Sequence, residues 1–329
     1  MVHAVVTTMA TLTPLHLDDA RRLGAAYGLD VASVRGIPAG SVNSNYALAL
    51  AGGGQVFLRV YEEQQAAAAA GEARLLAHLA GEGVKTPRPR LLVADAGRFI
   101  AEHAGKPVAV FPWIEGDSLC QKLVTTEAAH RLGAALGEVH RAGDSFVGAA
   151  PSRFGVPQLA SRLRGLEAMD LDPELAAVVA RLGDDLARLG DRPIASEGLI
   201  HGDLFRDNVL WQGGEIAALL DFESASIGSR PFDLMVTILA WCFNDGLDPE
   251  LARSLVAGYT RARPLPEAEA EALHVEGSFA ALRFSITRIT DFELRPRGQG
   301  VYKDYRRFVA RAAALAELSP RGLRALLGV

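Results

Sequence analysis

The stretch between residues 199 and 221 constrains the fold of this chain more than any other. An apolar segment ends at Ile200, and a polar loop that contains Asp203 and Asn208 follows it. A second apolar segment begins at Val209, and a third ends just before Asp221. Short apolar runs separated by polar turns are typical of strands joined by tight connections. The pattern predicts that the side chains of Asp203, Asn208 and Asp221 meet at one edge of a small β-structure.

Two carboxylates and one amide oxygen at such an edge form a suitable set of ligands for a hard cation. Mg²⁺ prefers oxygen ligands and is usually held by one or two carboxylates together with substrate phosphates. The sequence therefore indicates Mg²⁺ beside a bound phosphate compound.

The spacing His-x-Asp-x-x-x-x-Asn, followed by Asp221-Phe222, resembles the catalytic loop and metal-binding aspartate of protein-kinase-like phosphotransferases. More specifically, it looks like the aminoglycoside phosphotransferase and choline kinase superfamily. Residues 203–210 (DLFRDNVL) are similar to the type II homoserine kinases, and so are Asn43–Tyr46, Trp241-Cys242 and the segment 281–288.

The resemblance implies an α+β, protein-kinase-like fold with two lobes. The first lobe, at residues 1–112, would be a small antiparallel β-sheet with a helix and would bind the nucleotide. The second, at residues 113–329, would be larger, mostly helical, and would carry the catalytic and acceptor-binding groups. ATP and Mg²⁺ would be the cofactors.

The resemblance also implies roles for the residues of the motif. Asp203 would be the catalytic base, which in phosphoryl transfer orients the acceptor hydroxyl more than it deprotonates it. Asn208 and Asp221 would hold Mg²⁺. His201 would brace the Asp221 segment, and Asp233 would cap the catalytic loop from below.

Composition agrees with this class of protein. The length of 329 residues exceeds what one core usually holds, so two lobes are expected. The 34 basic and 39 acidic residues give a net charge of −5, which argues against a nucleic-acid partner bound by bulk charge. The 2 cysteines are too few for a disulfide framework, and no apolar run has the length of a membrane span. We expect a cytoplasmic monomer or homodimer that acts on a small-molecule hydroxyl acceptor, without a nucleic-acid or membrane partner.

Periodicity and turn residues predict the elements of each lobe. The first lobe should contain strands at 31–37, 46–50, 56–61, 90–93, 98–102 and 107–111, with a helix at 64–80. The second should contain helices at 126–141, 173–190, 231–243, 249–261, 266–294, 303–318 and 320–327.

A turn rich in small residues joins the first two strands and includes Gly40, Ser41, Asn43 and Asn45. Small residues allow backbone N–H groups to approach phosphate oxygens closely. We therefore expect these four residues to contact the nucleotide, although an ordinary flexible turn has the same composition.

Arg59 and Glu72 form a predicted pair in the first lobe. Arg59 lies on a half-buried strand, at a point where the superfamily usually has a lysine that binds phosphates, and a guanidinium can bind phosphate bidentately. Glu72, on the following helix, matches the position of the family's glutamate partner. The alternative is that Glu72 is an ordinary solvated charge.

The segment that leaves the first lobe carries Phe111, Trp113 and Ile114. In this superfamily the chain crosses between lobes here and contacts the adenine, so these residues should form an apolar slot for the base. Taken as structure alone, the segment could be a plain linker.

The nature of the acceptor can be tested against its charge. Homoserine carries a carboxylate and an ammonium, which need an anchoring cation and anion, whereas an aminoglycoside pocket would be mostly acidic. One departure from the homoserine kinases is the absence of aromatic residues directly after Asp221-Phe222. The candidates for the carboxylate are Arg206, Arg283 and Arg288, and those for the ammonium are Asp207, Glu223 and Asp245, although most such side chains form surface ion pairs.

Three functions are therefore open. The first is an ATP- and Mg²⁺-dependent kinase of L-homoserine that forms O-phospho-L-homoserine. The second is a kinase of another amino alcohol, such as an aminoglycoside, choline or a hydroxy amino acid. The third is a catalytically silent, kinase-like binding protein, which Arg59 in place of lysine favours weakly and the intact Asp203, Asn208 and Asp221 disfavour.

Overall fold

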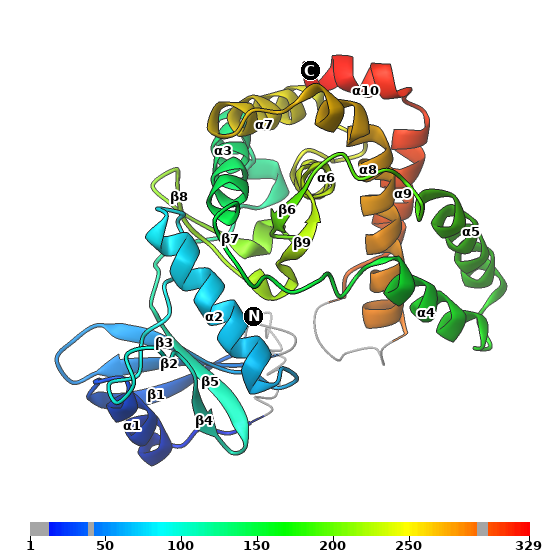
Figure 1. Ribbon diagram of the computed structural model, residues 1–329. Helices are drawn as coiled ribbons and strands as arrows, with labels where there is room; N and C mark the ends of the chain where they lie inside the picture. Colours follow the sequence, from blue (N-terminus) through cyan, green and yellow to red (C-terminus); the bar gives the residue numbers. More distant parts are fainter. Residues whose placement is uncertain (1–12, 39–42, 295–301) are drawn as a thin grey trace, which may run out of the picture. The chain divides into compact units, whose positions relative to one another are not determined.

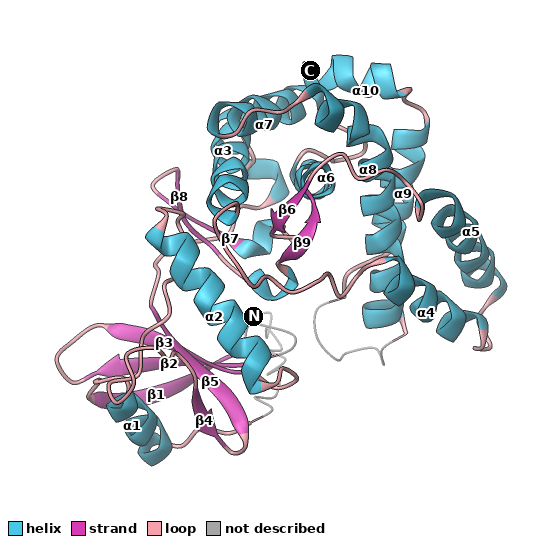
Figure 2. Ribbon diagram, in the orientation of Figure 1, coloured by secondary structure: helices cyan, strands magenta, loops and turns pink. Residues whose placement is uncertain are grey.

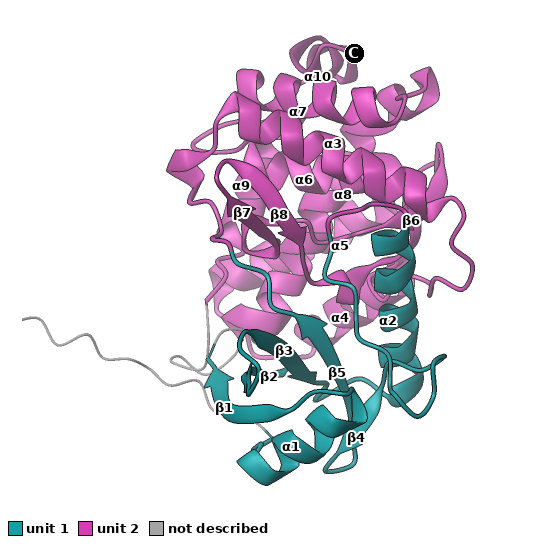
Figure 3. Cartoon of the chain, turned by 90° about the vertical axis from the view of Figure 1, so that its left-hand side faces the viewer, with its two compact units in different colours: residues 1–81, 86–115, 298–301 teal, residues 82–85, 116–297, 302–329 magenta. Residues whose placement is uncertain are grey.

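The computed structural model describes residues 13–38, 43–294 and 302–329, and the chain divides into two compact units. Unit 1 comprises residues 1–81, 86–115 and 298–301, and unit 2 comprises residues 82–85, 116–297 and 302–329 (Figure 3). The chain passes into unit 2 after Glu115, whereas the sequence placed the lobe boundary after residue 112.

Unit 1 contains a five-stranded antiparallel sheet with the order β1-β2-β3-β5-β4 (Figure 2). The strands are β1 (Val31–Ile37), β2 (Ser44–Leu50), β3 (Gln55–Val60), β4 (Ala101–His103) and β5 (Lys106–Pro112). Two helices complete the unit, α1 (Leu17–Ala26) and α2 (Ala66–Gly81).

Side chains alternate between the two faces of the sheet along each strand, and each face meets one of the two helices. Leu58 and Val60 belong to a buried core with Leu23 and Tyr27, which come from α1 and the residue that follows it. Neighbouring strand residues point to opposite faces, so Arg59 lies on the other face, where it meets Glu72 of α2.

The strand predicted at 90–93 is absent, and this prediction was wrong. Leu92 forms only an isolated bridge with Asp95, and the backbone N–H of Gly97 donates to the side chain of Asp95 (3.1 Å). This aspartate turn stops the strand, and β4 begins only at Ala101.

Unit 2 is mostly helical, as predicted. Its helices are α3 (Thr126–Gly143), α4 (Val156–Glu167), α5 (Pro173–Leu189), α6 (Arg230–Trp241), α7 (Pro249–Ala262), α8 (Glu267–Arg288), α9 (Arg306–Ala316) and α10 (Pro320–Leu327). Helix α4 was not predicted, and the helix expected at 266–294 ends as α8 at Arg288 and continues as one π-helical turn, Ile289–Glu293.

Helix α6 lies inside unit 2 and is surrounded by α3, α7 and α8 (Figure 1). Every residue from Pro231 to Trp241 is buried. A helix that is apolar on all sides is typical of the centre of a domain, so α6 is a rigid support for the segments around it. Within the described ranges, no helix combines the length and the apolar character needed to cross a bilayer.

Two small antiparallel ribbons hold the segment that the sequence singled out. β7 (Val209–Gln212) pairs with β8 (Glu215–Leu219), as the glycine turn between them predicts. β6 (Glu197–Ile200) does not pair with β7; it pairs with β9 (Ser226–Ser229), a strand that the sequence analysis did not identify. The loop between β6 and β7 and the turn between β8 and β9 are therefore brought to one end of the two ribbons.

A reciprocal glycine contact joins α3 and α7. A Cβ atom at Gly133 would lie 1.9 Å from the carbonyl oxygen of Leu255, and one at Gly258 would lie 1.9 Å from that of His130. Real Cβ atoms do not approach backbone oxygen so closely, so the two helices can pack at this distance only with glycine at both positions.

We predict that Gly258→Ala lowers the free energy of unfolding of unit 2 by about 3 kcal/mol, because the added methyl group forces α3 and α7 apart. Urea denaturation followed by tryptophan fluorescence measures the change, since two of the three tryptophans, Trp211 and Trp241, lie in unit 2. Gly165→Ala is the matched control, because a Cβ at this position of α4 meets nothing within 4 Å. An equal stability of the two variants would contradict the packing argument.

Candidate active site

The loop between β6 and β7 is held in one conformation by its own hydrogen bonds. The side-chain amide of Asn208 donates to the backbone carbonyl of Asp203 (2.8 Å), and the backbone N–H of Phe205 donates to the same oxygen (2.8 Å). Gly202 has φ +77°, a conformation that glycine adopts without strain. The side chains of Asp203 and Asn208 therefore come from one rigid turn.

A buried carboxylate anchors the start of this loop. Asp233, in the first turn of α6, accepts hydrogen bonds from the backbone N–H groups of His201 (2.7 Å) and Gly202 (2.7 Å) and from Nε2 of His140 (3.0 Å). Burial alone would raise the pKa of the Asp233 carboxyl, but these hydrogen bonds and the neighbouring histidines bring it below its usual value. The prediction that Asp233 caps the loop is confirmed.

His201 connects the loop to the second acidic segment. A ring nitrogen, Nε2, lies 3.0 Å from the carbonyl oxygen of Leu220, next to Asp221, and the backbone N–H of Leu220 donates to the carbonyl of Asn208 (2.8 Å). The predicted brace is present. These two contacts place the backbone of Asp221 next to that of Asn208.

Asp221 has an unusual backbone conformation. Its φ of 61° and ψ of 62° lie in the left-handed region, which few residues other than glycine adopt. Residues held in this region are concentrated at functional sites. Within the described ranges, no group of three or more His, Cys, Asp or Glu side chains could hold a metal ion. The side chains of Asn208 and Asp221 carry oxygen atoms, the ligand type that Mg²⁺ prefers.

Asp203 lies beside a buried arginine. Its side chain is 26% exposed, and Oδ1 lies 3.7 Å from Nη1 of Arg283. Burial raises the pKa of the Asp203 carboxyl, and the charge of Asp221 adds to this effect, while Arg283 and Lys303 oppose it. The net shift is upward, so this carboxylate is a stronger base than an exposed aspartate.

Arg283 is buried beside one carboxylate, Asp203, but two of its nitrogen atoms make no hydrogen bond to a described residue. Only 3% of the residue is exposed, and neither Nε nor Nη1 makes a hydrogen bond to any residue that the structure describes. Its guanidinium carbon lies 3.7 Å from the ring centre of Phe284 and 4.0 Å from that of Phe154. Burial lowers the pKa of Arg283 to about 10, against the opposing effect of Asp203.

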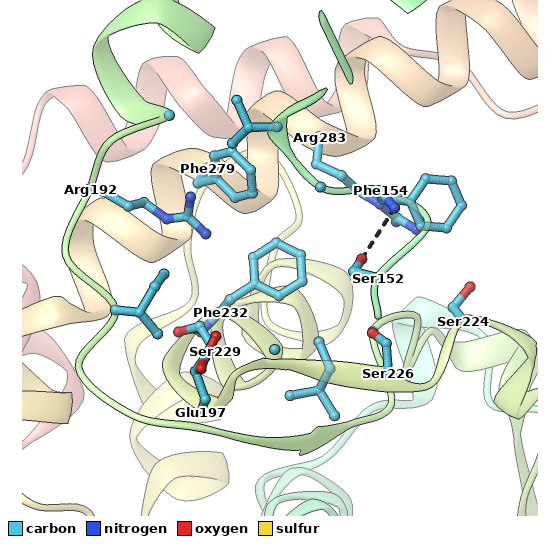
Figure 4. A pocket seen from close by; sticks show the side chains of 17 residues that line it. Ser152, Phe154, Arg192, Glu197, Ser224, Ser226, Ser229, Phe232, Phe279 and Arg283 are labelled. Carbon is cyan, nitrogen blue, oxygen red and sulfur yellow. Dashed lines mark hydrogen bonds between the residues drawn. The ribbon is translucent and has the colours of Figure 1, made fainter. Parts of the chain in front are cut away.

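A cavity of about 230 Å³ in unit 2 extends from this arginine (Figure 4). Gly202 and Ser224 belong to its lining, so one side of the cavity adjoins the catalytic loop. Arg192 and Arg283 approach it from opposite sides, and aromatic rings lie between them in Figure 4. The other labelled side chains of the lining are Ser152, Phe154, Glu197, Ser226, Ser229, Phe232 and Phe279.

The other predicted acceptor residues lie outside this lining. Arg206 donates to the side chain of Gln121 and to the carbonyl of Ala240, and Asp207 pairs with Lys303 (3.1 Å). Arg288 donates to the carbonyl of Asp304 (2.9 Å), and Glu223 lies in the short helical turn Phe222–Ser224. Asp245 lies in the connection between α6 and α7. Of the three predicted arginines, only Arg283 lines the cavity.

In unit 1, Nη1 of Arg59 lies 3.5 Å from Oε1 of Glu72. Asn45 lies opposite Arg59 in the register of β2 and β3, so its side chain lies on the same face of the sheet. Oδ1 of Asn43 accepts a hydrogen bond from the backbone N–H of Glu62 (3.2 Å). Gly40 and Ser41 lie outside the described residues.

The predicted adenine-contacting residues lie at the end of β5. Phe111 is buried in the sheet, and Trp113 and Ile114 follow it as partly exposed residues of unit 1. Nε1 of Trp113 is buried and makes no hydrogen bond within the described part of the chain. Trp113 and Ile114 thus expose part of their apolar surface, whereas Phe111 and the unused donor of Trp113 are buried.

Several cavity residues were missed by the sequence analysis. Phe154 lies in the loop before α4, Arg192 follows α5, and Phe279 lies on α8. None belongs to a motif, and Phe279 has the helical spacing of an ordinary core residue. Only the fold brings these residues together, so no sequence signal could have identified them.

Comparisons with known proteins agree with this geometry. A family model described as "Phosphotransferase enzyme family" matches residues 33–271. The homoserine kinase of Phenylobacterium zucineum is 36% identical over 299 residues, covering 88% of this chain and 90% of that protein. The homoserine kinase of Methylobacterium radiotolerans is 36% identical over 300 residues, covering 86% and 89%.

Two solved structures show the same fold. The amicoumacin kinase hAmiN in complex with AMP-PNP, Ca²⁺ and Ami has a TM-score of 0.70 at 17% identity, covering 92% of this chain and 95% of that chain. Choline kinase from Cryptosporidium parvum Iowa II has a TM-score of 0.67 at 14% identity, covering 94% and 99%. The predicted fold class and family resemblance are confirmed. The chain belongs to the phosphotransferase enzyme family and is a homoserine kinase-like member of it.

Proposed function

We propose that this chain is an ATP-dependent kinase that transfers the γ-phosphate to the side-chain hydroxyl of L-homoserine. The names of its relatives support this substrate. The observation that carries the proposal is the buried Arg283, which lies between Asp203 and a cavity and has donor atoms without a hydrogen-bond partner in the described chain.

Asp203 acts on the acceptor hydroxyl. Its carboxylate accepts a hydrogen bond from this hydroxyl and orients the oxygen toward the γ-phosphorus. As the new oxygen–phosphorus bond forms, the bond between the γ-phosphorus and the bridging oxygen of ADP breaks, and the hydroxyl proton passes to Asp203. The raised pKa of the Asp203 carboxyl favours acceptance of this proton.

Arg283 binds the acceptor's carboxylate. A guanidinium donates two parallel hydrogen bonds to a carboxylate, and such charge-assisted bonds are strong in a desolvated site. Oγ of Ser226, which lines the same cavity, is buried and makes no hydrogen bond to a described residue, so it can accept one from the ammonium group. The cavity thus offers partners for both charges of a zwitterion.

The same lining disfavours a polycationic acceptor. Of its two arginines, Arg192 is paired with the buried Glu276 (2.8 Å), so Arg283 is the cation that faces the cavity beside one lining carboxylate, Glu197. An aminoglycoside carries several ammonium groups, and a lining with one carboxylate beside a buried arginine offers too few partners for them. Charge therefore ranks a small amino acid above an aminoglycoside.

Asn208 and Asp221 are the proposed ligands of Mg²⁺, which when bound neutralises charge on the phosphates during transfer. In unit 1, Arg59, positioned by Glu72, and the predicted turn residues would bind phosphate oxygens, while Phe111, Trp113 and Ile114 would contact the adenine. An arginine with its planar fork can replace the usual lysine in this role, so Arg59 does not by itself imply a silent kinase.

We predict that Asp203→Asn lowers kcat for homoserine by about 10³-fold, because the amide cannot accept the proton, while the Kd for ATP stays within about twofold. Release of ADP in a coupled assay gives kcat, and calorimetric titration gives the Kd. Asp170→Asn, at an exposed carboxylate outside the site, is the control. Loss of ATP binding in Asp203→Asn would show that the role is misassigned.

We predict that Arg283→Met raises the KM for L-homoserine by about 100-fold, since the substrate carboxylate loses a charge-assisted partner. The KM for 3-aminopropan-1-ol, the same amino alcohol without the carboxylate, should hardly change. Arg164→Met, at an exposed arginine of α4, controls for the loss of charge. An equal rise in KM for the two substrates would argue against carboxylate binding by Arg283.

We predict that kcat/KM decreases as the pH falls through the raised pKa of Asp203, because only the carboxylate can accept the proton. Arg283 lowers this pKa by its charge, so Arg283→Met should move the acidic limb of the profile to higher pH. Profiles of both proteins, measured with 3-aminopropan-1-ol, test the shift. An acidic limb that stays in place would contradict the proposed coupling.

A further inference from the structure

Four arginines of unit 2 form a group behind the catalytic loop. Arg206 belongs to the loop, Arg288 ends α8, and Arg307 and Arg311 lie one turn apart on α9. Arg288 and Arg311 are 9% and 7% exposed, whereas Arg307 is exposed to solvent. We call these four residues the arginine cluster. None of them lines the cavity beside Asp203.

The contacts of the arginine cluster bring its members to one place. The guanidinium carbons of Arg288 and Arg311 lie 4.5 Å and 4.7 Å from the ring centre of Phe308. Nη1 of Arg311 donates to the backbone carbonyl of Arg307 (2.8 Å). Nε of Arg311 donates to the carbonyl of Leu239 (2.7 Å), and Nη1 of Arg206 donates to the next carbonyl of α6. Arg206 and Arg311 therefore meet at the last turn of α6, Arg288 and Arg311 share the ring of Phe308, and Arg307 lies one turn before Arg311 on α9.

These carbonyls compensate part of the charge. The last carbonyls of a helix lack partners within the helix, and its C-terminus carries about half a negative charge. Arg206 and Arg311 both donate hydrogen bonds to carbonyls at this end of α6, and this contact gives these two arginines a structural role. The partial charge of the helix end leaves most of the charge of the four guanidinium groups without compensation.

Nearby carboxylates are already paired with other cations. Asp207 pairs with Lys303 (3.1 Å), and Asp304 pairs with Arg306 (3.6 Å). In the part of the chain that the structure describes, no carboxylate forms an ion pair with a member of the arginine cluster.

The positive charges of the arginine cluster disfavour one another. Burial lowers the pKa of Arg311 to about 9, and Arg288, Arg307 and Arg206 all act in the same direction, with no opposing carboxylate. Burial and Arg307 likewise lower the pKa of Arg288 to about 10, although Asp203, Asp207 and Asp304 oppose this. Partly buried like charges destabilise a fold unless an anion lies between them.

We propose that the arginine cluster is a binding site for a phosphate group, either inorganic phosphate or a phosphomonoester. Guanidinium forks bind phosphate oxygens bidentately, and a dianion compensates more of this charge than a carboxylate does. The exposed Arg307 gives the anion access from solvent. Because Arg206 belongs to the catalytic loop, a bound phosphate would link α8 and α9 to that loop.

Calorimetric titration of the full chain with sodium phosphate, without nucleotide or acceptor, tests the site. We expect saturable binding that Arg307→Ala weakens about tenfold, the effect of losing one charge-assisted hydrogen bond. Arg307 is exposed, so this variant should fold, and its unchanged melting temperature in sodium chloride would verify this. Arg321→Ala, at an exposed arginine of α10, removes the same charge elsewhere and should bind phosphate like the wild type.

A parallel titration with ethyl phosphate, a phosphomonoester without the carboxylate and ammonium groups that the acceptor cavity would bind, distinguishes the two sources of phosphate. Tighter binding of inorganic phosphate would identify the free ion as the ligand, and tighter binding of ethyl phosphate would identify a phosphomonoester. Absence of saturable binding, or equal affinity of the wild type and Arg307→Ala, would overturn the proposal. Neither outcome bears on the kinase reaction, because no turnover is measured.

Discussion

The active-site geometry depends on one buried carboxylate, that of Asp233. It accepts hydrogen bonds from two backbone N–H groups at the start of the catalytic loop and from one ring nitrogen of His140. The other ring nitrogen of His140 lies 2.8 Å from the hydroxyl oxygen of Tyr259. A buried charge without partners would be strongly destabilising. With these partners satisfied, the carboxylate links the catalytic loop to α3, α6 and α7 and leaves the loop little freedom to move.

The other end of α6 holds the same loop. Nε1 of Trp241, in the last turn of α6, donates to the carbonyl of Leu204 (2.9 Å), and Arg206 donates to the carbonyl of Ala240. The start of the loop is thus hydrogen-bonded to the first turn of the buried helix α6, and the middle of the loop is hydrogen-bonded to its last turn. Phosphoryl transfer needs little covalent chemistry from the protein and depends on positioning. A loop fixed along the length of a rigid helix supplies that positioning.

How much the sequence predicts depends on whether a feature is local. The resemblance to the family implied the brace at His201, the cap at Asp233 and the Arg59–Glu72 pair, because each lies in a short segment that matches the family's pattern. The pairing of β6 with β9 was not predictable, because β9 is only four residues long and contains glycine and serines. The cavity lining was also beyond reach, since Phe154, Arg192 and Phe279 come from three distant segments. Proximity of such residues is a result of tertiary packing, which periodicity does not describe.

Arg283 connects the stability of the fold with its chemistry. A guanidinium that is desolvated between two aromatic rings, with donor atoms that no described residue satisfies, destabilises the free protein. A substrate carboxylate would restore the lost hydrogen bonds, so part of the binding free energy comes from removing this strain. An acceptor without a carboxylate would leave the arginine unsatisfied and would be rejected more strongly than its smaller size alone implies.

The same guanidinium also lowers the pKa of the Asp203 carboxyl. Once its charge is shared with a substrate carboxylate, that effect weakens, and Asp203 becomes a better proton acceptor when the correct substrate is bound.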